Sequence, residues 1–354
     1  MPRIIDFAPL TSPVTPTEVA AFKVEAKARP DFAGPSTAMM VFVLVIVMFV
    51  LGSIAIGIVG AIGAVISTVT DSPIAATVVS LALIALLVFG TIVLVRASSR
   101  KRWESWYRLD RFASRNGMRF SPSDANPQYP GAIFSNGHSR QSLNHFRSNS
   151  SRFLDYGNYR YTTGSGKNRS THNWGFLALA LDRSLPHMVL DSRANNGLFG
   201  ASNLPAAFQK DQILSLEGDF DNYFTLYCPR QYERDALYVF TPDLMALLID
   251  HAAPFDVEVV DQWMFIYSAA PFDVLQSAVH HRLLSIVDTV GAKTLTQTDR
   301  YSDERVQDFA ANVVAPQGLR LKRRFPLVAV IIVGAVLLWF FVVPFFTAIF
   351  AAFA

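Results

Sequence analysis

The chain contains a single cysteine among its 354 residues, so it cannot form an intrachain disulfide. Such sparing use of cysteine is typical of proteins that fold in a reducing compartment. The cysteine lies in the stretch YFTLYCP, where strand alternation places Phe224, Leu226 and Cys228 on one face. We therefore expect Cys228 to be a buried structural thiol and not a nucleophile.

Signatures of common catalytic sites are also missing. The sequence has no Gly-x-Ser-x-Gly elbow, no zinc-ligand pair and no dinucleotide fingerprint. The stretch TTGSGKNRST contains the Gly-Lys pair of a phosphate-binding loop, but Tyr161 and Asn168 stand where that loop needs a glycine and a hydroxyl residue. We interpret Lys167 as a solvated turn residue between two strands, with Gly164 and Gly166 adopting positive φ. The sequence thus predicts no cofactor and favours a role other than that of an enzyme.

Charge is missing from three long stretches of the chain. Residues 37–70 and 72–95 contain no charged side chain and are separated by Asp71 alone, and residues 325–354 form a third apolar stretch. The composition agrees, with 51% hydrophobic residues and a mean hydropathy of +0.28. About 20 apolar residues cross a bilayer as a helix, so each stretch is long enough to span. The sequence therefore predicts a membrane anchor of three transmembrane helices.

Basic residues flank these stretches on one side only. They precede the first stretch, follow the second in RASSRKRWESWYRLDR and precede the third in RLKRR, whereas the intervening loop STVTDSP has none. Because basic flanks stay in the cytoplasm, we expect a multi-pass protein of the cell (plasma) membrane with its C-terminus outside. The predicted parts are a cytoplasmic tail (1–37), a transmembrane hairpin (38–97), a cytoplasmic domain with a linker (98–318) and a C-terminal transmembrane helix (319–354).

The first apolar stretch carries small residues at helical spacing. In GSIAIGIVGAIGA, Gly57, Gly60 and Ala64 lie on or near one helix face, and small residues spaced in this way let two backbones approach closely. The partner is either the second helix of the hairpin or, as the alternative, a second copy or a foreign subunit. Neither helix of the hairpin has an ionisable side chain, which weighs against a proton or ion pathway.

The helix after the second stretch is predicted to continue out of the membrane. Its sequence RKRWESWYRLDRFASRNG places Trp103 and Trp106 at helical spacing among arginines. Tryptophan and arginine favour the headgroup layer, so we expect these residues to contact membrane lipid.

Period-two alternation indicates a domain built on an antiparallel sheet. FDVEVVDQWMFIY predicts a hairpin with its bend at Asp261-Gln262, and NWGFLALALDR, HMVLDS and DNYFTLYC predict further strands. Helices are fewer: TPDLMALLIDHA starts at Thr241, and PFDVLQSAVHHRLLSIVDTVG ends at Gly291. Residues 294–318 are predicted to form a linker with a short helix at DERVQDFAANVV. The predicted fold class is a membrane α-helical anchor plus a cytoplasmic α+β domain.

Charge is divided along this domain. Residues 103–183 carry a net charge of +6 and residues 184–319 a net charge of −10. The basic half follows the membrane stretch, so proximity to lipid accounts for it and no nucleic acid is predicted as a partner. The acidic half is a solvated face or, as the alternative, a surface for a basic partner.

Several polar clusters are candidate sites. The acidic turn LEGDFDNY presents Glu217, Asp219 and Asp221, which are the candidate ligands if the protein binds a divalent metal. The adjacent pair His280 and His281 has the wrong helical spacing for a metal and is predicted to lie on the surface. A structural role is favoured for two other histidines, His187 and His251. The outward face of NYFTLY supplies the candidate interaction residues Tyr223, Thr225 and Tyr227.

Four stretches of the chain carry a resemblance to a known family. They are RFASRNGMRF, YPGAIF, LPHMVLD and LEGDFDNYFTLYCPRQYERDALYVFTPDLMALLID, and together they cover about residues 103–290. There the chain resembles actinobacterial integral-membrane proteins of unknown function in which membrane spans flank one cytoplasmic domain. The resemblance implies the topology and fold class given above and transfers no catalytic residue.

These observations favour a membrane-tethered cytoplasmic interaction module for protein or lipid partners. One alternative is a membrane-bound, metal-dependent enzyme using Glu217, Asp219 and Asp221. The other is an accessory subunit of a transporter or secretion complex, suggested by the small residues of the first predicted helix.

Overall fold

The computed structural model describes residues 5–32, 52–53, 57, 60–65, 68, 73–150, 152–197, 202–306 and 312–323. The chain forms two compact units, with Arg3–Asp124 in one and Ala125–Ala354 in the other. Most of the first predicted membrane helix and all of residues 325–354 fall outside the described residues. The first and third membrane helices therefore stay predictions.

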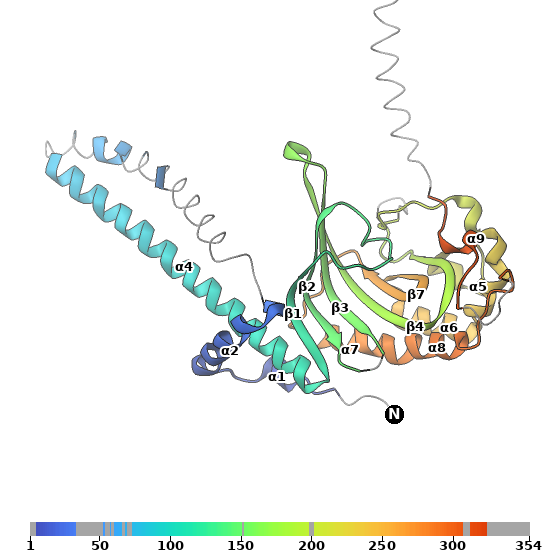
Figure 1. Cartoon of the computed structure of the whole chain (residues 1–354). Helices are drawn as coiled ribbons and strands as arrows, with labels where there is room; N and C mark the ends of the chain where they lie inside the picture. The colour runs from blue at the N-terminus through green and yellow to red at the C-terminus, as the bar shows by residue number, and fades with distance from the viewer. Residues whose placement is uncertain are drawn as a thin grey trace, which may run out of the picture. The chain divides into compact units, whose positions relative to one another are not determined.

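The first unit is organised around one long helix, α4 (Pro73–Arg115), which runs without interruption for 43 residues (Figure 1). Its first part exposes large apolar side chains such as Leu81 and Leu94, whereas its last turns bury Leu109 and Phe112. Among the described residues, Leu81–Arg115 is the one helix that is long and apolar enough to cross a membrane, judged by length and composition. The predicted continuation of the helix beyond the apolar stretch is confirmed.

Residues 5–32 pack against the polar half of α4. Their elements are α1 (Ala8–Thr11), α2 (Pro16–Ala28) and the 3-10 turn η1 (Pro30–Phe32), and the strand β1 (Met118–Ala125) follows α4. Helix α2 starts at Thr15, whose side chain forms a capping box with Glu18. The Phe22 ring packs edge-on against Trp103, with ring centroids 6.3 Å apart. An edge-to-face aromatic pair contributes stabilising free energy beyond that of the apolar area it buries, so this contact holds α2 on α4.

The second unit contains a curved antiparallel sheet in the order β2-β3-β4-β6-β5, with β7 also paired to β4 (Figure 1). Its strands are β2 (His138–Ser148), β3 (Leu154–Thr163), β4 (Ser170–Ser192), β5 (Ile213–Leu214), β6 (Phe224–Tyr227) and β7 (Asp256–Ser268). Strand β4 is central, because β3 and then β6 pair with one of its edges while β7 pairs along the other. The predicted α+β class with an antiparallel sheet is confirmed.

Helices cover one face of this sheet (Figure 1). A buried cluster rich in aromatic side chains, which includes Phe134, Trp174, Phe176 and Phe265, packs on the other face. The α-helices are α5 (Glu233–Val239), α6 (Pro242–Leu247), α7 (Ser277–Ile286), α8 (Ala292–Thr298) and α9 (Pro316–Leu319), with π-helical turns η7 (Leu248–Ala252) and η8 (Val287–Gly291). Short 3-10 turns are η2 (Gly166–Asn168), η4 (Lys210–Gln212), η5 (Phe220–Asn222) and η6 (Arg230–Tyr232). On the helical face, a Cβ at Gly291 would lie 2.8 Å from a methyl carbon of Leu179, so only glycine fits without movement there.

Two strand predictions are wrong in the same way. The hairpin predicted around Asp261 is one continuous strand, β7, and the separate strands NWGFLALALDR and HMVLDS are one continuous strand, β4. Both strands bend where their pairing shifts register between Ala180 and Met188, and Asp261 adopts a positive φ of 53° opposite this bend. The polar residues that indicated turns therefore mark an irregularity within a long strand pair.

Three further predictions on this unit need correction. The helix predicted to end at Gly291 continues through α8 to Thr298. His280 is fully buried, because its ring lies between Tyr156 and the backbone of Val274, whereas His281 is exposed as predicted. Burial of His280 lowers its pKa to about 4, so the ring is neutral near pH 7.

The predicted linker is the third case. The described part of residues 294–318 packs into the unit and begins within α8. Asp303, near its middle, is 2% exposed and accepts hydrogen bonds from Tyr232 and from the Ala315 amide. Residues 303–306 form turns, and the remainder of the short helix predicted there lies largely outside the described residues.

Candidate functional site

A buried carboxylate joins strands β2 and β3 to the loop before them. Asp155 accepts a hydrogen bond from the Tyr129 hydroxyl at 2.6 Å, lies 2.8 Å from Nδ1 of His145 and forms an ion pair with Arg147 at 3.1 Å. Burial alone would raise the pKa of Asp155, but the attraction of His145 and Arg147 holds that pKa below its usual range. These contacts tie the loop before β2 to strands β2 and β3.

A second buried carboxylate lies on β7. Glu258 accepts hydrogen bonds from the Tyr267 hydroxyl at 2.6 Å and from the Ala132 amide at 2.7 Å, and it pairs with Nε2 of His187 at 2.7 Å. The other ring nitrogen of His187 accepts from the Leu321 amide at 3.0 Å. His187 thus links the sheet to the C-terminal segment, which agrees with the structural role favoured for it. His251 lies half-buried in the π-helical turn η7.

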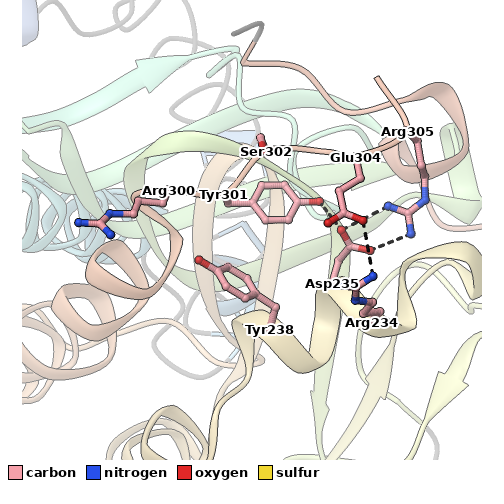
Figure 2. Close-up of a pocket in the computed structure, with 8 residues that line it drawn as sticks. All are labelled: Arg234, Asp235, Tyr238, Arg300, Tyr301, Ser302, Glu304 and Arg305. Carbon is pink, nitrogen blue, oxygen red and sulfur yellow. Dashed lines mark hydrogen bonds and ion pairs between the residues drawn. The ribbon is translucent and has the colours of Figure 1, made fainter. Parts of the chain in front are cut away.

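A surface pocket of about 250 Å³ opens beside α5 and the end of α8 (Figure 2). Its lining residues are Arg234, Asp235, Tyr238, Arg300, Tyr301, Ser302, Glu304 and Arg305. Sequence reasoning missed this site, because the lining comes from two segments more than sixty residues apart and one of them was predicted to be a linker. The only signal was the density of tyrosine and arginine in both segments.

The floor of the pocket is held by a network of ion pairs. Arg305 contacts Asp235 at 2.9 Å and Asp303 at 3.1 Å, and its guanidinium lies 3.9 Å from the centroid of the Tyr232 ring. Tyr301 donates a hydrogen bond to Asp235 at 2.8 Å (Figure 2). A charge that is paired and hydrogen-bonded in this way is fixed in position. The floor is therefore rigid, and its acidic groups are neutralised within the chain.

The rim of the pocket is basic and aromatic. Arg234 is 86% exposed and contacts Glu304 at 3.5 Å, and Tyr238 is 43% exposed. Within the described part of the chain, Arg300 makes neither a hydrogen bond nor an ion pair. The lining carries three arginines and two acids, and Asp303 beneath it also pairs with Arg305, so Arg300 is the cation of the lining that has no acidic partner among the described residues. Arginine and tyrosine are the residues that protein interfaces favour.

The predicted interaction residues lie on or beside β6. Tyr223 is 37% exposed and precedes the strand, while Thr225 is half-buried within it. Tyr227 is also half-buried, and its ring packs against Phe208 with centroids 5.4 Å apart. Tyr223 therefore presents the larger part of this predicted surface, and its role in binding stays a prediction.

The three carboxylates of the acidic turn differ in their exposure to solvent and in their hydrogen bonds. Glu217 and Asp219 are exposed, whereas Asp221 accepts hydrogen bonds from the Ser215 hydroxyl and the Leu216 amide. In the described ranges no group of three His, Cys, Asp or Glu residues is placed to hold a metal ion. A metal at Glu217, Asp219 and Asp221 stays a prediction.

Two residues match their predicted placement. Lys167 is exposed in the turn η2, with positive φ at Gly164 and Gly166. Cys228 is 1% exposed, and burial raises the pKa of its thiol to about 12. A thiol of that kind is protonated and unreactive at neutral pH.

The tryptophans predicted to contact lipid lie in the first unit. Trp103 is 9% exposed because α2 covers it, and its ring packs edge-on against Trp106 with centroids 5.1 Å apart. Trp106 is half-buried, and Arg102 lies 5.3 Å from its centroid. Gly57, Gly60 and Ala64 are helical, and a Cβ added at Gly57 or Gly60 would have no atom within 4 Å.

Comparison with known proteins gives little. No protein-family model and no curated protein matches the chain. The crystal structure of the mycobacterial trehalose monomycolate transport factor A, TtfA, is similar over 54% of this chain and 90% of that chain, with 11% sequence identity and a TM-score of 0.34. A similarity at this level leaves the function to be argued from the residues of the chain itself.

Proposed function

We propose that the protein is a membrane-anchored interaction module that acts as an accessory subunit of a larger membrane assembly. The observation that carries this proposal is the continuity of α4, which joins an exposed apolar stretch to a polar half packed against residues 5–32. Because the helix is continuous, the residues packed on its polar half keep a fixed position relative to the apolar stretch. In this proposal the anchor has three membrane helices, with the α+β unit on the cytoplasmic side.

The proposed contact surface is the rim of the pocket formed by Arg234, Tyr238 and Arg300. Its basic and aromatic side chains project from a floor that ion pairs make rigid, and a preorganised surface loses less conformational entropy on binding. The partner that fits is an acidic segment of another membrane protein. Gly57, Gly60 and Ala64 supply a second proposed contact, between helices within the membrane.

The test is extraction of the full chain from its native membranes in mild detergent, followed by sizing and mass spectrometry of the proteins that stay bound. We expect a stoichiometric partner. The double variant Tyr238→Ala and Arg300→Ala should lower its recovery at least tenfold, because interface tyrosine and arginine residues often contribute about 2 kcal/mol or more each.

Two control variants make the result specific. Lys167→Ala with Arg169→Ala removes exposed side chains from the turn between β3 and β4 and should leave recovery unchanged. Tyr223→Ala tests the surface beside β6 predicted from the sequence. Recovery of the chain as a lone monomer would contradict the proposed function, and equal recovery with all variants would contradict the proposed surface.

A further inference from the structure

A groove of about 360 Å³ lies in the first unit, between the start of α2 and the middle of α4. Its lining residues are Val14, Thr15, Pro16, Val19, Ala20, Lys23, Arg96, Ser99, Arg100, Trp103 and Glu104. The side formed by α2 and the residues before it is apolar except for Thr15 and Lys23, and α4 supplies Arg96 and Arg100 on the other side. The volume is within the range of small-molecule sites.

The basic groups of the groove lack acidic partners. In the part of the chain that the structure describes, Arg96 and Arg100 form no ion pair, and Lys23 lies over the Trp103 ring with its ammonium 5.6 Å from the centroid. The one acidic lining residue, Glu104, is already paired with Arg108 at 3.1 Å. The groove thus holds three cations with unsatisfied charge, which favours an anionic ligand.

The shape of the groove is fixed by contacts outside it. Arg108 donates hydrogen bonds to the carbonyl oxygens of Leu10 at 3.1 Å and Ser12 at 2.6 Å, which hold the segment before α2 on α4. Arg29 pairs with Asp110 at 2.9 Å and fastens the far end of α2. The side formed by α2 therefore stays at a constant distance from the side formed by α4.

The position of the groove along α4 identifies its ligand. Residues 72–95 carry no charge, and Arg96 is the first charged residue after them. A helix rises about 1.5 Å per residue, so Arg96 and Arg100 cover about the first 6 Å beyond the apolar stretch. The headgroup layer on each side of a bilayer is roughly 5–8 Å thick. If residues 72–95 span the membrane, both arginines lie at the depth of the lipid phosphates.

We propose that this groove binds the headgroup of an anionic phospholipid. The phosphate contacts Arg96, Arg100 and Lys23, the headgroup rests on the apolar wall formed by Val19 and Ala20, and the acyl chains extend along the exposed apolar side chains that precede Arg96 on α4. This proposal does not depend on the pocket beside α5, because the groove lies wholly within the first unit. The two proposals can therefore fail separately.

The test uses the full chain, reconstituted in nanodiscs of phosphatidylcholine containing a fixed share of phosphatidylglycerol. Native mass spectrometry then counts the lipids retained after release from the nanodisc. We expect one phosphatidylglycerol to be retained in preference to phosphatidylcholine. The variant Lys23→Gln with Arg100→Gln should lower that retention about twenty-five-fold, because each Lys or Arg near a lipid surface contributes about a factor of five.

Matched variants distinguish a site from a general attraction. Lys27→Gln with Lys101→Gln removes the same charge from the same two helices at exposed positions outside the groove, and should lower retention far less. Ala20→Trp fills the groove while keeping every charge and should abolish retention. Equal effects of the two double variants, or full retention in Ala20→Trp, would show diffuse attraction and overturn the proposal.

The source of the phosphate is tested separately. If inorganic phosphate in the buffer displaces the retained phosphatidylglycerol from the full chain, the groove is a site for the free anion. Equal retention of phosphatidylcholine and phosphatidylglycerol would also overturn the proposal, since the cations would then confer no selectivity.

Discussion

At the scale of single residues, Asp256 at the start of β7 is a carboxyl group in surroundings that disfavour its charge. The side chain is fully buried, and Oδ1 accepts a hydrogen bond from the Ser192 amide at 2.8 Å. Among the residues that the structure describes, none lies within hydrogen-bond geometry of Oδ2. Burial, together with the nearby negative charge of Asp191, raises the pKa of Asp256 to about 7. An unfolded chain would give this group a pKa of about 3.9.

This shift predicts a pH-dependent stability. Between about pH 4 and pH 7 the folded protein keeps a proton on Asp256 that the unfolded chain has released, so this contribution is complete at low pH and is lost as pH rises through about 7. Asp256→Asn replaces the protonated carboxyl group with an amide of similar shape that does not titrate. Its free energy of unfolding, relative to the wild type, should rise by up to about 1.4 kcal/mol per pH unit over that interval.

The measurement is unfolding of the full chain in detergent at several pH values. Asp243→Asn is the control, because Asp243 is 79% exposed in its ion pair with Lys293 and should show no such trend. A constant difference between Asp256→Asn and the wild type at every pH would contradict the assignment.

At the scale of elements, Asp303 joins the segment that leads to α9 to the turn η6, which precedes α5. Its carboxylate accepts hydrogen bonds from the Tyr232 hydroxyl at 2.6 Å and the Ala315 amide at 2.8 Å. Burial would raise the pKa of Asp303, but these hydrogen bonds and those from Arg305 hold it below the usual range. The carboxylate therefore stays charged and bound at neutral pH.

Loss of this carboxylate should destabilise the segment. Asp303→Ala leaves a buried hydroxyl and a buried amide without their acceptor, and we expect a loss of about 3 kcal/mol in unfolding free energy. Glu304→Ala removes a neighbouring carboxylate that is 71% exposed and should change the stability by less than about 0.5 kcal/mol. Chemical denaturation and limited proteolysis of residues 300–315 would measure both. Equal stability of the two variants would show that the segment is held in another way.

The sequence predicts local elements well and long-range pairing poorly. Alternation located β6 and the burial of Cys228, because both depend on neighbours two residues apart. It could not show that β4 and β7 bend together, since that bend depends on pairing between Leu185 and Asp261, which are far apart in the chain. A polar run therefore indicated a turn where the structure has a shared irregularity.

The candidate site was missed for a related reason. Arg234 and Tyr238 come from α5, while Arg300 and Tyr301 come from a segment whose polar composition indicated a linker. Composition does not reveal that Asp303 is buried by a distant tyrosine. In the same way, helical spacing placed His280 and His281 apart but could not tell which of them faces the sheet.

At the scale of the whole molecule, the buried thiol of Cys228 makes topology measurable. It should not react with a maleimide in the folded protein, so any label will come from an engineered cysteine. We predict that a membrane-impermeant maleimide labels Ser72→Cys on intact cells, whereas Ser12→Cys and Lys167→Cys are labelled only after permeabilisation. Labelling of Lys167→Cys on intact cells would reverse the predicted orientation, and labelling of the wild type would contradict the assignment of Cys228.

Few residues separate the end of the second unit from the last predicted membrane helix. Arg320 forms a two-pronged ion pair with Asp261 at 2.8 and 2.9 Å, and the Lys322 amide donates to Gln212 at 2.8 Å. The apolar stretch begins at Phe325, and an extended chain covers about 3.5 Å per residue. If that stretch spans the bilayer, the end of the second unit at Lys322 is held within roughly 10 Å of the lipid surface.

Such a short connection to the membrane changes how the unit encounters a partner. A partner diffusing in the same membrane is met by a search in two dimensions at high effective concentration, whereas a protein dissolved in the surrounding solution gains no such advantage. The pinning of residues 320–323 to the sheet would thus select membrane-resident partners by geometry, before any side chain makes contact.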